Sequence, residues 1–303
     1  MLQFFQNLFG KKPAKKTEAV PAATAVKTAP LSEEQLDTVS KPELKFTPPQ
    51  LLVGTAQSVG LQRDHNEDTI YAMQAVFADG RSDLPFGIFI VADGMGGHQN
   101  GEVASGVAAK AMAEYLVSHF YTPFLSGDAT SGDSIHEIME GAVREAQRAV
   151  VRSAPGGGTT LTAALLLGEQ VTLAHVGDSR AYFAHPDGRM RVMTQDHSLV
   201  KRLQDLGQID EKEASIHPQR NVLYRALGQP EPFRPDINTY NIPHPGFMLL
   251  CSDGLWGSVP DDDMFRIVQG AENPSVACSN LVHAANEAGG PDNISAILVQ
   301  YMS

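Results

Sequence analysis

The sequence predicts an α+β fold in which short strands and amphipathic helices occur in blocks. Four mainly apolar runs have the length of buried strands, at 86–92, 160–167, 247–251 and 294–299. Turn residues at 168–169 and 186–188 predict two hairpins, which indicates antiparallel sheet. Helical spacing of apolar residues predicts helices at 102–120, from Ser134 onward, at 261–269 and at 275–288. Ser134 and Glu137 have the spacing of a capping box.

Length and charge limit the class of protein. The chain has 303 residues, of which 42% are hydrophobic, so it can bury the core of one large domain. Its net charge is −12, and residues 51–303 hold 16 Lys and Arg against 30 Asp and Glu. This acidic body argues against nucleic-acid binding and suits capture of cations. The two cysteines, Cys251 and Cys278, form no disulfide framework, and we find no cleavable signal peptide, so we expect a cytoplasmic protein.

Residues 1–50 differ from the rest in composition. They contain K-K-P-A-K-K at 11–16, then an Ala, Pro, Thr and Val mixture, and we expect a disordered low-complexity tail. The first nine residues carry Leu2, Phe5, Leu8 and Phe9 at helical spacing. Nine residues cannot span a bilayer, so no transmembrane segment is expected. A peripheral contact with a membrane or a partner is the alternative to a plain tail.

Acidic residues recur at the ends of the apolar runs. Asp93 follows such a run in V-A-D-G-M-G-G, and an Asp-Gly pair alone is typical of a turn. Glycine also lets a backbone carbonyl approach a hard cation, so the alternative is a metal site. The same setting occurs at four further positions: Asp68, Asp178, Asp253 and Asp292. Five such residues favour a shared acidic pocket.

Six ordered motifs carry a family resemblance. They are R-D-H-N-E-D, V-A-D-G-M-G-G, G-G-T-T-L-T-A, V-G-D-S-R, C-S-D-G and G-G-P-D-N. Over residues 53–301 the chain resembles the metal-dependent PPM (PP2C-type) serine/threonine protein phosphatases of the bacterial branch. The resemblance implies a four-layer α/β/β/α arrangement, an antiparallel β-sandwich flanked by helices, in a domain at 51–303. Residues 197–225, where charges interrupt the apolar pattern, would form a flap subdomain of exposed helices beside the active site.

The resemblance and the residue types together assign roles. Asp93 is expected to bridge two metal ions, Asp253 and Asp292 to complete one of them, and the Gly94 carbonyl with water the other. Oxygen ligands with water suit Mn²⁺ or Mg²⁺ better than zinc. By resemblance, Asp178 belongs to a third, weaker position shared with Asp253.

Three further residues adjoin this metal cluster. The resemblance puts a phosphate-binding arginine at Arg63, whose planar fork suits a phosphate. Glu67 and Asp68 would point to opposite faces of a regular strand. We therefore expect Asp68 to approach the metals and Glu67 to contact them through water. Both residues would surround the principal ligands Asp93, Asp253 and Asp292.

The expected reaction is direct hydrolysis of phosphoserine or phosphothreonine in proteins, opposing a Ser/Thr kinase. The alternative is a catalytically weak regulatory module that binds phosphoproteins, but the three principal aspartates are all present. Eukaryotic relatives have a histidine as proposed general acid where this chain has Met95, and a thioether cannot donate a proton. The general acid is therefore left open.

The G-G-G run at 156–158 lacks the Gly-Lys-Ser/Thr of a phosphate-binding loop, so we expect a flexible connection there.

Overall fold

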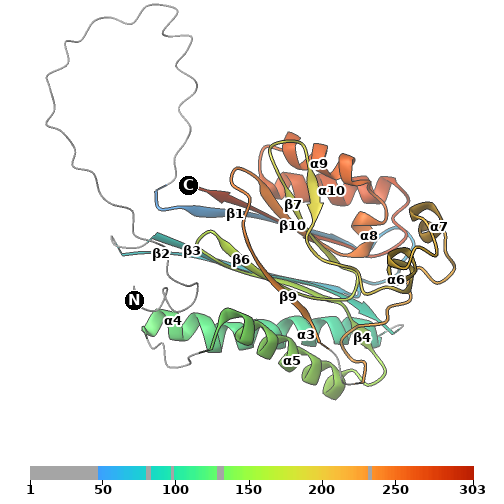
Figure 1. Ribbon diagram of the computed structural model, residues 1–303, viewed down its shortest axis with the longest axis horizontal. Helices are drawn as coiled ribbons and strands as arrows, with labels where there is room; N and C mark the ends of the chain where they lie inside the picture. Colours follow the sequence, from blue (N-terminus) through green and yellow to red (C-terminus); the bar gives the residue numbers. More distant parts are fainter. Residues whose placement is uncertain (1–46, 80–82, 97–98, 128–132, 231–233) are drawn as a thin grey trace, which may run out of the picture. The chain divides into compact units, whose positions relative to one another are not determined.

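Two antiparallel sheets lie face to face, and helices cover the outer face of each (Figure 1). The computed structural model describes residues 47–79, 83–96, 99–127, 133–230 and 234–303, which belong to the unit Thr47–Ser303. The layers follow the order helix, sheet, sheet, helix. This confirms the predicted α+β class and the four-layer arrangement. The predicted tail lies outside the described residues except at 47–50.

In the described part of the chain, the first sheet has five strands in the order β1, β11, β10, β7 and β8. Their bounds are β1 Gln50–Ser58, β11 Ile294–Met302, β10 Phe247–Cys251, β7 Arg180–Ala184 and β8 Met190–Val192. Every pairing is antiparallel, and β7 and β8 form the hairpin predicted around 186–188.

The second sheet follows the order β2, β3, β5, β6 and β9, with the short β4 paired to β3. The bounds are β2 Asp68–Ala78, β3 Asp83–Met95, β4 Gly158–Thr159, β5 Leu161–Leu167, β6 Gln170–Val176 and β9 Asp236–Asn241. The β5–β6 hairpin turns at Gly168 and Glu169, as predicted.

Helices α3 and α5 cover the second sheet, and α8, α9 and α10 cover the first (Figure 1). Their bounds are α3 Gln99–Leu116, α5 Ile135–Ser153, α8 Asp253–Trp256, α9 Asp261–Gly270 and α10 Pro274–Glu287. Ser134 and Glu137 form the predicted capping box of α5. The predicted helix at 102–120 begins earlier and continues through a π-helical turn η1, Val117–Tyr121, into α4, Thr122–Ser126. No helix among the described residues is long and apolar enough to cross a membrane.

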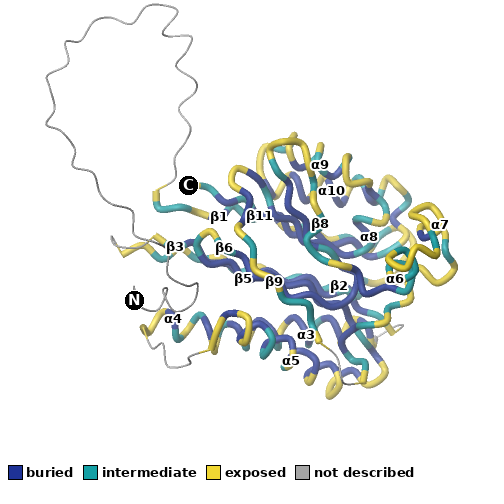
Figure 2. Tube along the Cα trace, in the orientation of Figure 1, coloured by how far each residue is buried: buried dark blue, intermediate teal, exposed yellow. Residues whose placement is uncertain are grey.

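Burial explains the apolar runs. Residues 86–92 of β3 are all buried because α3 lies on one side of this strand and the other sheet on the opposite side (Figure 2). The edge strand β2 instead alternates between half-buried and exposed residues along most of its length. Side chains from both sheets interdigitate around Phe89, Phe183 and Ile297, while Leu249, Leu281 and Leu298 pack between the first sheet and its helices. The strands are therefore held rigidly by close packing, and so are the residues at their ends.

The segment from 197 to 225 carries two short helices, α6 Leu199–Asp205 and α7 Glu211–Ser215. Ser198 and Asp210 cap them through their side chains. Of the residues within them, only Ala214 is buried. The segment thus projects from the sandwich as an exposed helix pair.

Candidate active site

Five aspartates distant in sequence meet at one end of the two sheets. Asp68 begins β2 and lies opposite Asp93 of β3 in the antiparallel register. Asp178 lies in the turn between β6 and β7, Asp253 follows β10, and Asp292 precedes β11. Neighbouring antiparallel strands reverse direction, so the end of one strand and the start of the next share an edge. The structure thus brings together all five acidic positions singled out in the sequence.

Asp68 joins the two sheets at this edge. One oxygen, Oδ2, accepts hydrogen bonds of 2.7 Å from the hydroxyls of Ser252 and Ser295, which belong to the opposite sheet's strand ends. The other oxygen, Oδ1, is buried and has no hydrogen-bond partner among the residues that the structure describes. A buried carboxylate oxygen without a donor is costly unless a proton or a cation reaches it.

Burial and mutual repulsion both disfavour charge in this cluster. Burial, with the neighbouring Asp253 and Asp292 adding to it, raises the pKa of Asp68 to about 7. Burial and then Asp292 raise the pKa of Asp253 to about 6. The pKa of Asp93 is raised well above its usual range by burial and by four surrounding carboxylates. Asp93 and Asp253 also lie within hydrogen-bonding reach of each other. Such a group gains stability from bound cations.

The donor set fits hard divalent cations. Within the described ranges, no three His, Cys, Asp or Glu side chains are already gathered around one point as ligands. Mg²⁺ and Mn²⁺ do not need such an enclosure, since they are held by one or two carboxylates, a carbonyl and several waters. Asp93, Asp253 and Asp292 each keep part of their surface exposed. Charge, oxygen chemistry and access therefore agree with the metal assignment.

The main chain of Asp93 is held by two threonines. Its N–H donates to Thr160 Oγ1 over 2.9 Å, and its carbonyl accepts from Thr160 N–H and from Thr159 Oγ1. Thr159 and Gly158 form β4, in which Thr159 pairs with Gly94 and Gly158 with Met95 of β3. The expected flexible connection at 156–158 is therefore wrong for Gly158, because its strand completes the ladder beside Asp93.

Close packing requires glycine next to Asp93. A Cβ on Gly94 would lie 2.2 Å from the carbonyl oxygen of Gly101, and a Cβ on Gly101 would lie 2.7 Å from the Glu67 carboxylate. Glu67 stands just outside β2, and its carbonyl accepts from Gly94 N–H. The strand alternation assumed for Glu67 and Asp68 therefore does not apply, because the strand begins only at Asp68. Asp68 faces the carboxylate cluster, whereas Glu67 packs against the start of α3.

Arg63 lies on a loop that is fastened to the loop of Asp292. The Arg63 guanidinium donates to Asp292 Oδ2 over 2.7 Å, and its side chain is 46% exposed. Asn293 donates from Nδ2 to the carbonyls of Val59 and His65, and its Oδ1 accepts from Glu67 N–H. One amide side chain thus fixes both ends of the arginine loop. Arg63 is placed beside the acidic cluster and within reach of solvent.

The two ends of the 197–225 segment are joined by one polar cluster. His197 Nε2 contacts Asp236 Oδ2 at 3.1 Å, and Arg225 donates to Asp236 Oδ1 at 2.8 Å. The other ring nitrogen of His197 accepts from Gly177 N–H, next to Asp178. The base of the 197–225 segment is therefore connected to the turn that carries Asp178.

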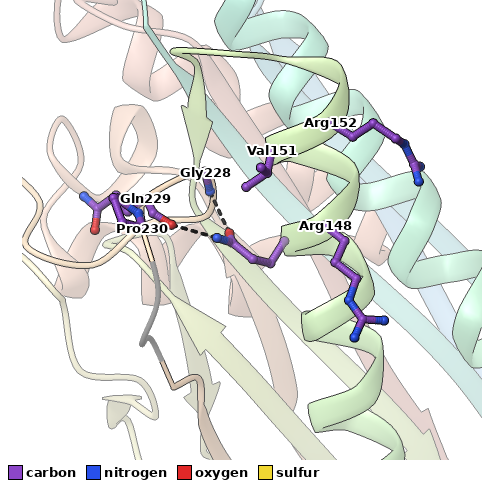
Figure 3. A pocket seen from close by; sticks show the side chains of 7 residues that line it. Arg148, Val151, Arg152, Gly228, Gln229 and Pro230 are labelled. Carbon is purple, nitrogen blue, oxygen red and sulfur yellow. Dashed lines mark hydrogen bonds between the residues drawn. The ribbon is translucent and has the colours of Figure 1, made fainter.

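The chain leaving this segment, residues 226–230, is held against α5 by two hydrogen bonds to Gln147, which Figure 3 draws as dashed lines at Gly228 and Gln229. The Gln147 amide donates to the carbonyl of Gln229 and accepts from Gly228 N–H, both at 2.7 Å. A cavity of 470 Å³ lies beside it, and the Arg148 and Arg152 side chains point away from residues 228–230. Leu227 pairs with Thr159, so this contact supports the strand beside Asp93.

Comparison with known proteins decides the family. The sequence profile described as Protein phosphatase 2C matches residues 66–273, more than half of the chain. The chain belongs to the protein phosphatase 2C family. This confirms the predicted bacterial PPM resemblance and the predicted enzyme class, a metal-dependent protein serine/threonine phosphatase. It also agrees with the expected class of cofactor, Mn²⁺ or Mg²⁺.

Individual relatives cover most of this phosphatase. The serine/threonine phosphatase stp of Listeria innocua is 36% identical over 249 residues, which are 80% of this chain and 92% of the relative. PstP of Mycobacterium tuberculosis is 36% identical over 79% of this chain and 43% of its own length. The crystal structure of the PstP catalytic domain with two manganese ions has a TM-score of 0.66, 31% identity and coverage of 84% of this chain and 99% of that one.

Several residues of the phosphatase site were not identified in the sequence. Thr159, Thr160, Ser252, Ser295 and Asn293 hold the aspartates or the arginine loop. The first two lie in the G-G-T-T motif, whose threonines are a usable signal because buried hydroxyls need partners. Ser252 adjoins Asp253, and Asn293 and Ser295 follow Asp292 by one and three residues, but hydroxyls and amides are common in turns. Only their positions across the two sheets distinguish them.

Proposed function

We propose that this phosphatase hydrolyses phosphoserine and phosphothreonine esters of proteins in one step. Water attacks phosphorus and loses a proton, the P–O bond to the Ser or Thr side chain breaks, the released side-chain oxygen gains a proton to become a hydroxyl, and no phosphoenzyme forms. The observation that carries the proposal is the edge where five aspartates meet beside an exposed arginine, with the pKa values of Asp68, Asp93, Asp178 and Asp253 raised by burial and by neighbouring carboxylates. Carboxylates to hold cations and a guanidinium to bind phosphate are the parts that phosphoester hydrolysis requires.

Within this proposal, Asp93 would hold both of two Mn²⁺ or Mg²⁺ ions. Asp253 and Asp292 would complete the ligands of one ion, and the Gly94 carbonyl with water those of the other; Asp178 and Asp253 would hold a third. When bound, such ions lower the pKa of water and neutralise phosphoryl charge. Support comes from the buried Oδ1 of Asp68 at the same edge, which has no partner within the described part of the chain, and from the two manganese ions of the PstP structure.

Arg63 binds the phosphoryl oxygens. A planar guanidinium binds two oxygens at once, and the partial exposure of Arg63 leaves it accessible to a phosphorylated side chain. Asn293 keeps the loop in place, so little conformational entropy is lost when phosphate binds. Met95 takes no part in proton transfer.

The substrates are phosphorylated proteins, and the phosphatase would oppose a Ser/Thr kinase. Segment 197–225 acts as the flap and would influence which proteins are bound, since it projects from the sandwich beside Asp178. The cysteines are both buried with free thiols, which suits the reducing cytoplasm.

The deciding experiment measures hydrolysis of para-nitrophenyl phosphate and of a phosphothreonine peptide, with Mn²⁺ and after chelation. We expect turnover only with the metal, and none in Asp93→Ala. A protein that binds the phosphopeptide but does not hydrolyse either compound at saturating Mn²⁺ would instead be the regulatory module. Retained activity in Asp93→Ala would remove the bridging role.

A further inference from the structure

Trp256, the single tryptophan of the chain, lies against the turn that carries Asp178. Its indole Nε1 donates to the carbonyl oxygen of Asp178 over 3.0 Å. The guanidinium carbon of Arg180 lies 3.6 Å from the centroid of the indole ring. One half-buried side chain therefore contacts the main chain of Asp178 and the side chain two residues further on.

Arg180 is itself held rigidly. It makes two hydrogen bonds to the carboxylate of the buried Asp196, at 2.9 and 2.7 Å, and a third to the hydroxyl of Tyr182 at 3.1 Å. A guanidinium fixed in this way offers its flat face to the indole without further loss of freedom. The stack thus holds the indole ring in one orientation.

Trp256 also fixes the spacing of two acidic residues. It ends the single turn of α8 that begins with Asp253. Within the described residues, its N–H makes the hydrogen bond that joins the Asp178 turn to α8. On its other side, the turn is held by Thr162, which donates to the Ser179 carbonyl, and by His197 at Gly177. Loss of the indole N–H would free only the side that faces Asp253.

We propose that Trp256 is a positioning residue that sets the Asp178 carboxylate against Asp253 so that both can hold one cation. The inference rests on the proposed function, in which these two aspartates share the third ion position. A purely structural role would be filling of the adjacent core, because Trp256 packs at the margin of the cluster around Leu255 and Val259. Metal affinity separates the two roles, since packing alone would change stability.

The test uses Trp256→Phe, which keeps an aromatic face and removes the N–H. Tyr240→Phe is the matched control. Tyr240 lies on β9, away from the acidic cluster, and its aromatic side chain also donates to a backbone carbonyl, that of Met193. Free Mn²⁺ is followed by electron paramagnetic resonance during titration of the full-length protein. We expect Trp256→Phe to retain the two tight ions and to bind the weakest ion about tenfold less tightly, as for other residues that orient metal ligands.

Binding of all ions as in wild type by folded Trp256→Phe would overturn the proposal, as would loss of every ion. Wild-type protein that binds only two ions would overturn it and remove the third ion position, while the phosphatase reaction with two ions would stand, and protein that binds none would contradict both. A second measurement needs no tryptophan variant. Fluorescence of Trp256 should change on titration with diamagnetic Mg²⁺, and the phase with the weakest affinity should be missing in Asp178→Ala. If the fluorescence of Trp256 in the wild-type protein does not change during the phase with the weakest Mg²⁺ affinity, the positioning role is also refuted.

Discussion

The guanidinium of Arg63 donates a 2.7 Å hydrogen bond to the carboxylate of Asp292. The two residues are far apart in the chain, and Asn293 brings them together by binding the carbonyls of Val59 and His65. The group proposed to bind phosphate and a group proposed to hold metal are therefore neighbours. Binding of the phosphoryl group and of the cations should be coupled through this pair.

Arg63→Ala should weaken phosphate binding more than the chemical step. We expect KM to rise with a smaller loss in kcat, about 1.5 to 3 kcal/mol in total for a charged hydrogen bond. Steady-state kinetics with para-nitrophenyl phosphate measures both constants. Arg189→Ala is the control, since Arg189 is an exposed arginine that pairs with Asp187 at a hairpin turn. Unchanged kinetics in Arg63→Ala would refute the phosphate role.

Asp178→Ala should retain more Mn²⁺ binding and more activity than Asp93→Ala. Asp93 is proposed to contact two ions, so its loss should abolish activity even at millimolar Mn²⁺. Asp178 would contact only the third, so calorimetry should still find the tight ions while turnover falls. If Asp178→Ala binds no Mn²⁺ at all, or turns over like wild type throughout a Mn²⁺ titration, this division of roles is incorrect.

Thr160→Val should lower both stability and kcat. The change removes the acceptor of the Asp93 N–H and the 2.7 Å contact with Ser179 Oγ, and leaves a buried N–H unpaired. This should cost about 1 to 3 kcal/mol in urea unfolding. The control is Thr172→Val, because Thr172 is equally buried and pairs with Thr239 away from the site. Equal kcat values in the two variants would show that Thr160 does not position Asp93.

The chelated protein should lose stability as pH rises from 6.5 to 8. The pKa of Asp68 is about 7 in the folded protein, against about 4 when unfolded. The folded state therefore binds more protons than the unfolded state in this window. As Asp68 ionises, the free energy of unfolding falls by roughly 1 kcal/mol. Thermal unfolding with EDTA should show a falling midpoint, and Asp68→Asn should flatten the curve. A midpoint that rises with pH in chelated wild type would contradict the raised pKa.

Removal of residues 1–46 should leave turnover of a small phosphate ester nearly unchanged. The first sheet begins at Gln50, and none of the proposed ligands precedes Arg63. Kinetics of the truncated and full-length proteins provide the comparison. A truncated protein that melts normally but is inactive would place part of the catalytic unit in the tail.

The sequence alone determined the features that depend on near neighbours. Apolar runs predict the strands because buried strands have few polar residues, and the β5–β6 hairpin follows from two runs separated by Gly168 and Glu169. The capping box of Ser134 and Glu137 spans three residues. The aspartates could be singled out because each adjoins such a run. Their convergence followed once the strands were antiparallel.

Only the tertiary structure decided which groups hold those aspartates. Thr160 is 67 residues from Asp93, Ser252 and Ser295 are 184 and 227 residues from Asp68, and Trp256 is 78 residues from Asp178. Such pairs depend on the register within each sheet and on how the two sheets face each other. No local propensity encodes these distances, because they arise from packing of the whole core. The sequence therefore shows which residues carry charge, and the packed sandwich decides where each charge lies and what supports it.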